Sequence, residues 1–524
     1  MKKILALAAS LWLLLGLLSG CGSRYKDLRL DIQAPVTSLD PQFTTDPTGR
    51  MILKNVMEGL VVQRADGTLE PGAARTYEIS PDGRTYTFVL REDAVWENGD
   101  PVTAQDFVYA FRRMMNPQVP SPYTGEFSGI AGAREVLAGS LAPEQLGVWA
   151  KGDDTLIIEL EEASPLFLQR LAGTGALPCN QKFFEGTRAR YGMDKVYFLG
   201  NGPYHLSKWD NEKAVVLAAS QSYWDAGQVK TPSVTLYVGR EDPKGKFLGG
   251  GSDCYQLAYE DVEALDRGRF SYQTRDNTVW ALTFRQTQGP LADTRVRRAL
   301  VGAIDPAGIA QRVPGKYTLT QSLVPREAVL FQQPYRSQAG IPEPIGFLGD
   351  GAMPLLQEWL EEQGQESISG LNLIAPQSAD LAALGGYFQR MWQDHLMLYV
   401  NLEVLPDEEY RQRLAAGDFQ MALAAVSAAS DSPQGTLALY LSSATGNAAD
   451  YRNPEYDRLL AQAITSNRAA DAAALYAQAE EMLIRDAVAL PLFSEPTYFA
   501  MGRGVSGVEF AADGACYLKY AARE

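Results

Sequence analysis

Hydrophobic residues recur along this chain in two patterns, one with a period of two and one with spacings of three and four. The first pattern predicts strands near residues 28–32, 85–90, 154–160, 203–206, 214–217, 234–238 and 419–426. The second pattern predicts helices over residues 51–60, 103–115, 295–304, 353–362, 379–396, 408–415 and 471–485. Because strands and helices alternate along most of the chain, the pattern favours an α/β fold.

The helix predicted from residue 103 has the clearest start signal. It follows the turn sequence Asn98-Gly99-Asp100-Pro101. Thr103 stands where an N-cap residue is expected, and Asp106 follows three residues later, as in a capping box. Val102 and Phe107 occupy the two positions of a hydrophobic staple, which fixes the direction in which the chain enters a helix.

Two features that invite a functional interpretation are better explained as structure. His395 falls at the end of the apolar stripe of the helix predicted over residues 379–396, so we interpret it as a packing residue. The run Gly249-Gly250-Gly251 lacks both the spacing of a phosphate-binding loop and the lysine that follows such a loop. We therefore interpret the glycine run as a flexible turn.

The first twenty residues have the pattern of a secretory signal peptide. Lys2 and Lys3 precede an apolar run over residues 4–18, which is shorter than the roughly 20 residues that cross a membrane. The run ends in Leu18-Ser19-Gly20-Cys21, which matches a bacterial lipobox. We expect residues 1–20 to be removed and Cys21 to carry the lipid that anchors the protein outside the cytoplasm. The alternative is an uncleaved anchor with an incidental cysteine.

Composition argues against several function classes for this 524-residue chain. Its 47 Lys and Arg stand against 63 Asp and Glu, so a nucleic-acid-binding surface is not expected. The two histidines, His205 and His395, leave little material for a metal site or a catalytic triad, and we expect neither a cofactor nor an enzyme. Four cysteines are too few for a disulfide-built scaffold. Of Cys179, Cys254 and Cys516, at most two can pair with each other.

A series of short motifs connects these predicted elements. In chain order they are Ser38-Leu39-Asp40-Pro41, Glu58-Gly59-Leu60, Ser80-Pro81-Asp82-Gly83-Arg84-Thr85-Tyr86, Asn98-Gly99-Asp100-Pro101, Gly200-Asn201-Gly202-Pro203-Tyr204, Tyr223-Trp224, Asp293-Thr294-Arg295-Val296-Arg297 and Tyr451-Arg452-Asn453-Pro454-Glu455-Tyr456. The ordered series resembles the family 5 extracellular solute-binding proteins. These are the binding components of bacterial peptide and nickel ABC importers.

The resemblance implies a bilobed α/β fold of the periplasmic-binding-protein kind, with a hinge and an extra domain inserted into the first lobe. The expected parts are the signal peptide 1–20, the first lobe 21–61, 178–277 and 496–524, the inserted domain 62–177, and the second lobe 278–495. The chain would cross between lobes near Asn277 and Pro496. The implied partners are a peptide or another small solute and the membrane subunits of an ABC permease. We expect a monomer that contacts the membrane only through its lipid.

The resemblance also places a ligand site. Its expected residues are Thr45, Asp46, Tyr123, Ala425, Ser427, Ala429 and Asp431. In peptide-binding members an aspartate pairs with the free amino group of the peptide, but here that position holds Ala429. Asp431, two residues on, is either a repositioned amine anchor or a turn-forming residue before Ser432-Pro433. Tyr123 is either a ligand contact or a packed aromatic side chain.

Two functions remain open from the sequence. The first is an importer receptor that captures peptides or a related solute and delivers it to a permease. The second is a sensor or scaffold lipoprotein that keeps the binding-protein fold without transport, and the altered anchor position at Ala429 keeps this alternative open. A ligand that co-purifies with the protein would favour the receptor.

Overall fold

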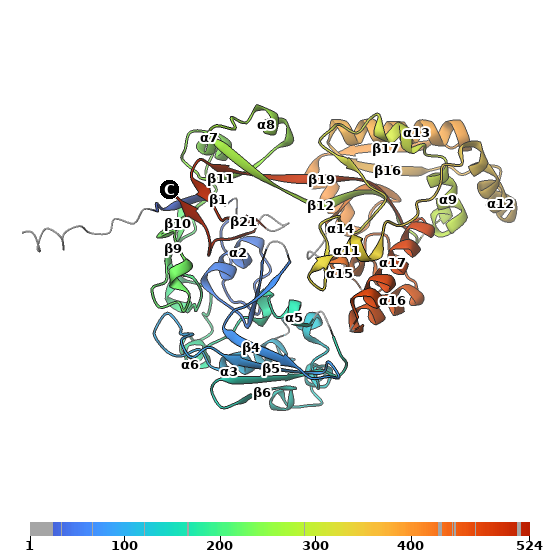
Figure 1. Ribbon diagram of the computed structural model, residues 1–524. Helices are drawn as coiled ribbons and strands as arrows, with labels where there is room; N and C mark the ends of the chain where they lie inside the picture. Colours follow the sequence, from blue (N-terminus) through green and yellow to red (C-terminus); the bar gives the residue numbers. More distant parts are fainter. Residues whose placement is uncertain are drawn as a thin grey trace, which may run out of the picture.

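The computed structural model shows two bodies joined by long strands (Figure 1). It describes residues 25–32, 34–64, 67–119, 121–164, 167–287, 289–427, 432–442, 444, 447–466, 468–510 and 515–524, with only the backbone at positions 277 and 427. Within these ranges no helix combines the length and the apolar character that a membrane crossing requires. Strands and helices alternate through both bodies, which confirms the predicted α/β class.

The first body contains a four-stranded sheet that the two ends of a long chain segment build together. Its order is β1 (Leu28–Ile32), β10 (Ser233–Val238), β9 (Ala214–Ala219) and β8 (Tyr204–Asp210). β1 runs parallel to β10, while the other neighbours are antiparallel. Since β1 pairs with a strand that follows it by about two hundred residues, the intervening chain leaves the sheet and returns to it.

The intervening chain forms a second four-stranded sheet, at the bottom of Figure 1. Its antiparallel order is β4 (Ala74–Ile79), β5 (Thr85–Leu90), β7 (Thr155–Glu159) and β6 (Val148–Lys151). Tyr86, Phe88 and Leu90 of β5 are buried, as their alternation predicts, in one core with Phe107 and Phe111 of α3 (Ala104–Met114). This core is continuous with that of the first sheet.

A larger sheet extends from the first body into the second body, where helices cover both of its faces. The sheet order is β11 (Cys254–Leu257), β19 (Ala489–Gly502), β12 (Phe270–Phe284), β18 (Met421–Ser427), β16 (Leu371–Pro376) and β17 (Val400–Leu405), and β13 (Thr318–Leu319) pairs with β19. One face packs against α9 (Thr294–Gly302), α12 (Met353–Gln363) and α13 (Ala379–Leu396), and the other against α16 (Pro454–Thr465) and α17 (Ala469–Arg485).

β12 and β19 are the strands that run from one body to the other (Figure 1). They pair antiparallel from Phe270 opposite Gly502 to Thr283 opposite Ala489. The register shifts between Arg275 and Thr278, and the opposite strand carries Pro496 there, which has no N–H to donate. The two crossings expected at positions 277 and 496 therefore lie at this irregularity. The exact domain boundaries stay a prediction.

The helix predicted over residues 51–60 differs from the observed one. α2 spans Pro47–Val56, because Asp46 caps it by accepting a hydrogen bond from the Gly49 N–H at 2.6 Å. It ends early because another part of the chain lies against its end. A Cβ atom on Gly202 would stand 2.6 Å from the Met57 nitrogen, so only glycine permits this approach.

Candidate ligand site between the two bodies

Tyr123 contacts the loop of residues 44–48, which carries the expected ligand residues Thr45 and Asp46. Its hydroxyl donates a hydrogen bond to the Thr44 carbonyl, and burial raises its pKa. The ring fills the space beside Gly175, where a Cβ atom would stand 2.7 Å from the Tyr123 Cγ. In this structure Tyr123 therefore positions the loop through its hydrogen bond to Thr44, and the Thr45 side chain is exposed.

Asp46 is half-buried and already engaged. One carboxylate oxygen caps α2, and the other accepts a hydrogen bond from the Thr37 hydroxyl at 2.8 Å. These bonds fix the entry into α2. An ionised carboxylate has about four lone-pair sites, so Asp46 keeps acceptor capacity for a ligand.

The remaining expected ligand residues lie on or after β18. Ala425 is exposed and pairs with Trp280 of β12, whose indole N–H donates to Glu495 at 2.6 Å. The backbone of Ser427 pairs with that of Thr278. Ala429, Asp431 and the lipidation candidate Cys21 lie outside the described residues. Their roles stay predictions.

A contact between the bodies that the sequence did not suggest lies close to this segment. Arg170, the last residue of α5 (Phe167–Arg170), donates to the Glu126 carbonyl at 3.0 Å. It also donates to Gln434 of α15 (Pro433–Leu437) at 3.4 Å. Burial raises the pKa of the Glu126 carboxyl, although the neighbouring Arg170 and Arg50 oppose the rise. No local pattern marks Arg170, because its partner lies 264 positions away.

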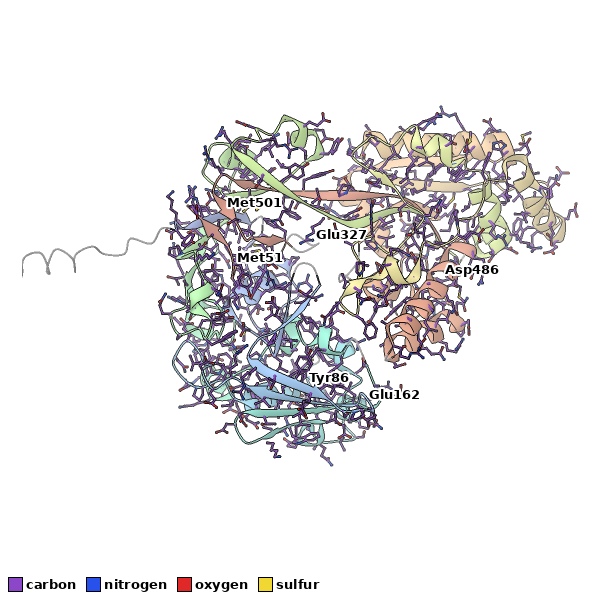
Figure 2. All side chains as sticks on the ribbon, in the orientation of Figure 1. Met51, Tyr86, Glu162, Glu327, Asp486 and Met501 are labelled. Carbon is purple, nitrogen blue, oxygen red and sulfur yellow. The ribbon has the colours of Figure 1, made fainter. Side chains whose placement is uncertain are left out.

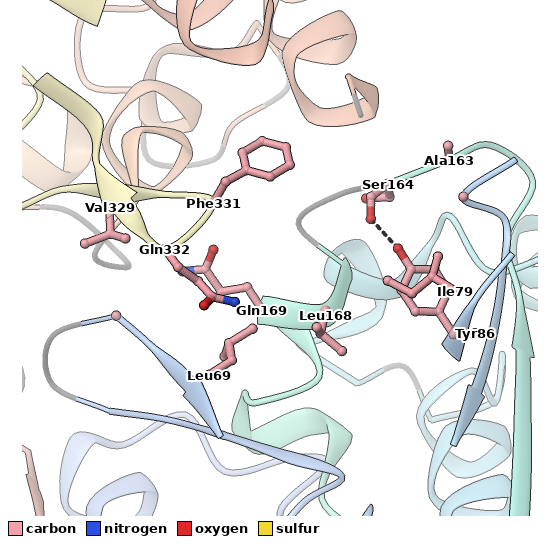
Figure 3. A pocket seen from close by; sticks show the side chains of 12 residues that line it. Leu69, Ile79, Tyr86, Ala163, Ser164, Leu168, Gln169, Val329, Phe331 and Gln332 are labelled. Carbon is pink, nitrogen blue, oxygen red and sulfur yellow. Dashed lines mark hydrogen bonds between the residues drawn. The ribbon is translucent and has the colours of Figure 1, made fainter. Parts of the chain in front are cut away.

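Residues of both bodies line a cavity of about 310 Å³ (Figure 3). We call it the hairpin cavity, because the hairpins β2–β3 (Val61–Gln63, Leu69–Pro71) and β14–β15 (Val329–Leu330, Gln333–Pro334) contribute to it. Its lining consists of Gly67, Leu69, Ile79, Gly83, Tyr86, Ala163, Ser164, Leu168, Gln169, Val329, Phe331 and Gln332. None of these twelve residues carries a charge at neutral pH. The volume is at the lower end of the range of about 300–1,000 Å³ for ligand pockets.

A second cavity, of about 380 Å³, lies beside the crossing strands and is polar. Thr278 of β12 and Glu495 of β19 line it together with Glu260 and Lys316. Lys316 forms ion pairs with Asp380 at 2.8 Å and with Glu260 at 3.5 Å. The two carboxylates balance the charge of the Lys316 ammonium, so these charged side chains stabilise the structure beside the crossing strands.

The motifs that carry the family resemblance meet in space around Glu58. This buried carboxylate accepts hydrogen bonds from the Tyr223 hydroxyl and from the Trp224 indole N–H, the latter at 2.6 Å. Asn201 pairs with the backbone of the same residue in both directions, at 3.0 and 2.9 Å. Three motifs far apart in sequence therefore form one structural joint.

Asp40, in the first of these motifs, contacts Arg113 of α3. The two side chains form an ion pair, and both are largely buried. The guanidinium also donates to Gln42 at 2.7 Å and lies 4.3 Å from the centre of the Phe184 ring. The opening motif thus ties the first segment of the chain to the inserted sheet.

His395, the three cysteines and the glycine run 249–251 lie in surroundings that indicate structural roles. His395 is half-buried, with Nδ1 2.7 Å from Asp350 and its ring edge-on to Phe347. Cys179, Cys254 and Cys516 are buried, and no disulfide joins any two of these three residues. Over the described ranges, no three His, Cys, Asp or Glu side chains gather in a way that would hold a metal ion. The glycine run 249–251 follows α7 (Pro243–Leu248) as a turn, as predicted.

Comparison with known proteins assigns this arrangement to a family. The sequence profile of the bacterial extracellular solute-binding proteins, family 5 middle, matches residues 68–448. The periplasmic oligopeptide-binding protein OppA of Haemophilus influenzae is 29% identical over 478 residues, covering 87% of this chain and 86% of its own. The oligopeptide-binding protein OppA of Bacillus subtilis is 26% identical over 510 residues, covering 94% and 92%.

A solved structure extends the match to three dimensions. Haemophilus influenzae OppA in complex with RPPGFSPFR superposes with a TM-score of 0.73 at 26% identity, covering 95% of this chain and 99% of that one. This likeness confirms the predicted bilobed fold. The profile covers more than half of the 524 residues, and these relatives are binding proteins. The chain therefore belongs to the family 5 bacterial extracellular solute-binding proteins.

Proposed function

We propose that the protein captures peptides between its two bodies and delivers them to the membrane subunits of an ABC importer. Family membership carries this proposal, since the relatives that match nearly the whole chain are named for oligopeptide binding. The hairpin cavity supports it, because a ligand that contacts both bodies favours the arrangement that brings them together. The sensor or scaffold alternative gains no support from these relatives.

Movement between the bodies would be concentrated in β12 and β19. The ladder between these strands is interrupted between Arg275 and Thr278, next to Pro496. Backbone there has fewer paired groups than the regular ladder on either side, so it can bend at lower cost. We infer that this irregularity is the hinge between the first lobe and the second lobe.

The peptide would be held with little regard to its side chains at most positions. Extended peptides bind mainly through main-chain hydrogen bonds when they lie along strands. With Ala429 at the usual anchor position, the amino group of the ligand needs another carboxylate, and Asp431 is the nearest in sequence. We propose Asp431 as that anchor.

The protein would work outside the cytoplasm on a lipid tether at Cys21. The lipobox and the family both support this location. Two or more acyl chains anchor a protein stably, whereas one chain holds it only marginally. Cys21→Ser should release the protein into the soluble fraction. A fully processed variant that remained with the membranes would contradict the assignment.

Mass spectrometry of the released ligand tests the capture proposal directly. The protein is purified from its native membrane in mild detergent, washed and then denatured, and the small molecules that it releases are identified. We expect peptides of several sequences. If a single non-peptide compound is released and a mixture of short peptides does not displace it, the peptide proposal is wrong.

A further inference from the structure

The hairpin cavity joins the inserted sheet of the first body to the second body. Tyr86 and Ile79 belong to the inserted sheet, and Leu168 lies on α5 beside it (Figure 3). From the opposite side, the β14–β15 hairpin contributes Phe331 and Gln332. A molecule in this cavity would therefore contact both bodies; Figure 2 labels Tyr86 on the first body and Glu327, two residues before the β14–β15 hairpin, on the second.

The second wall is held in a conformation that these side chains seldom adopt. Phe331 and Gln332 form the two-residue turn between β14 and β15, with φ values of 52° and 61°. Such turns favour asparagine and glycine, because other residues are strained at positive φ. Strained residues of this kind concentrate at sites that clamp ligands.

The two hairpins also touch each other beside the cavity. Gly67 has a φ of 82°, and a Cβ atom there would stand 2.9 Å from a methyl carbon of Val329. Because a side chain at position 67 would collide with Val329, glycine permits the β14–β15 hairpin to lie this close to the first body. The contact between Gly67 and the Val329 side chain therefore sets how closely the two walls approach each other in this structure.

The lining favours an apolar guest. Leu69, Leu168 and Phe331 present hydrocarbon, and a charged group enclosed there would find no opposite charge among the lining residues. The Ser164 hydroxyl is buried and has no hydrogen-bond partner among the described residues, while its carbonyl accepts from the Tyr86 hydroxyl at 2.8 Å. The Ser164 hydroxyl is thus one polar group of the wall whose hydrogen-bonding capacity is unused among the described residues. The volume of about 310 Å³ is at the lower end of the range for ligand pockets, which suits part of a ligand such as one large side chain.

We propose that the hairpin cavity is a specificity subsite that receives one large aliphatic or aromatic side chain of the bound peptide. The inserted domain would then select ligands as well as support the first lobe. This inference rests on the proposed function, because it assumes a peptide held between the bodies. Burial of the side chain against both walls links its recognition to closure.

A scanning set of pentapeptides tests the subsite. Each peptide is penta-alanine with phenylalanine, leucine or aspartate at one position, and its affinity for the lipid-free Cys21→Ser protein is measured by calorimetry. We expect one position at which phenylalanine or leucine binds at least about tenfold more tightly than alanine, equivalent to about 1.4 kcal/mol. Aspartate at that position should bind more weakly than alanine.

Two variants locate the effect in the cavity. Gln169→Glu places a charge in the lining at constant shape, and should remove most of the advantage of phenylalanine. Gln365→Glu makes the same change on an exposed loop and should leave the advantage intact. Phe331→Gly removes the ring while relieving the positive φ, so it should lower the advantage without weakening the hairpin.

The outcomes separate the two proposals. If peptides bind but no position prefers a large apolar side chain, the subsite is refuted and the capture function stands. An advantage that survives in both Gln169→Glu and Phe331→Gly places the preference elsewhere and also refutes the subsite. If none of the peptides binds, the capture of peptides fails and the subsite fails with it.

Discussion

Arg297 is buried in the second body and should contribute strongly to its stability. The side chain is 2% exposed, and it donates to the carbonyls of Leu291 and Ala292 at 2.8 and 3.0 Å. It also donates to the carbonyls of Asp486 and Ala487, at 2.7 to 3.1 Å. Burial lowers the pKa of this guanidinium to about 10, so it remains a cation at neutral pH. It therefore joins the chain before α9 to the end of α17.

Arg297→Met keeps a long apolar side chain but removes every one of these donors. Four carbonyls lose a partner, and a buried group left unsatisfied costs about 1–3 kcal/mol. Removal of the buried cation and entry of water offset part of this cost, so we expect a loss of about 3–5 kcal/mol in the free energy of unfolding. Unfolding in urea, followed by circular dichroism, measures the loss.

The adjacent residue supplies a matched control. Arg298 is exposed, and Arg298→Met removes the same charge from the same helix. Exposed substitutions of this kind usually change stability by less than about 0.5 kcal/mol. Peptide binding at low temperature should be unchanged in both variants. If the two variants lose the same stability, or if Arg297→Met loses less than about 1 kcal/mol, the carbonyl contacts do not stabilise the protein as argued.

Four further outcomes follow from contacts described above. Tyr123→Phe should cost about 1 kcal/mol in unfolding free energy by leaving the Thr44 carbonyl without its donor, and a loss of affinity without any loss of stability would contradict its positioning role. Asp431→Asn should weaken the binding of a peptide with a free amino group by about a hundredfold or more, and should leave the affinity for its N-acetylated form unchanged. Equal affinity of the wild type for both forms would exclude Asp431 as the anchor. Small-angle scattering should show a smaller radius of gyration after peptide binding, and a constant radius with saturating peptide would contradict hinge closure. Because burial raises the pKa of Cys179 to about 12, a disulfide reagent at pH 8 should modify this thiol only after unfolding, and rapid reaction of the native protein would show that it opens locally.

Elements with strong local signals were predicted closely. The alternation in β5 and the capping box of α3 are both observed, with the Thr103 N–H donating to Asp106 at 2.8 Å. β19 was missed as a 14-residue strand. Pro491 and Pro496 interrupt its hydrogen-bonding pattern, and proline within a run normally argues against a strand. Its pairing with β12 overrides that local signal.

The site was predicted less completely than the fold, because its parts come from distant segments. The family motifs pointed to the loop that carries Asp46 and to Tyr123, whose hydroxyl donates to the Thr44 carbonyl of that loop. No pattern near Phe331 indicates that it lines a cavity together with Leu168 of the other body, since that depends on how the bodies sit together. A helix signal depends on neighbours in sequence, whereas an interlobe cavity depends on tertiary packing.

The way in which the C-terminal segment completes the first body has a consequence for folding during synthesis. Asn55 of α2 bonds the Cys516 carbonyl and the Leu518 N–H, both at 2.8 Å, across more than 460 positions. Tyr204 donates to the carbonyl of Leu518 at 3.0 Å. Contacts so far apart in sequence close slowly, and here one partner is synthesised more than 460 residues after the other. The first body to be started is thus the last to be completed, so the nascent chain stays accessible to chaperones and translocation machinery until residues 516–518 have been synthesised.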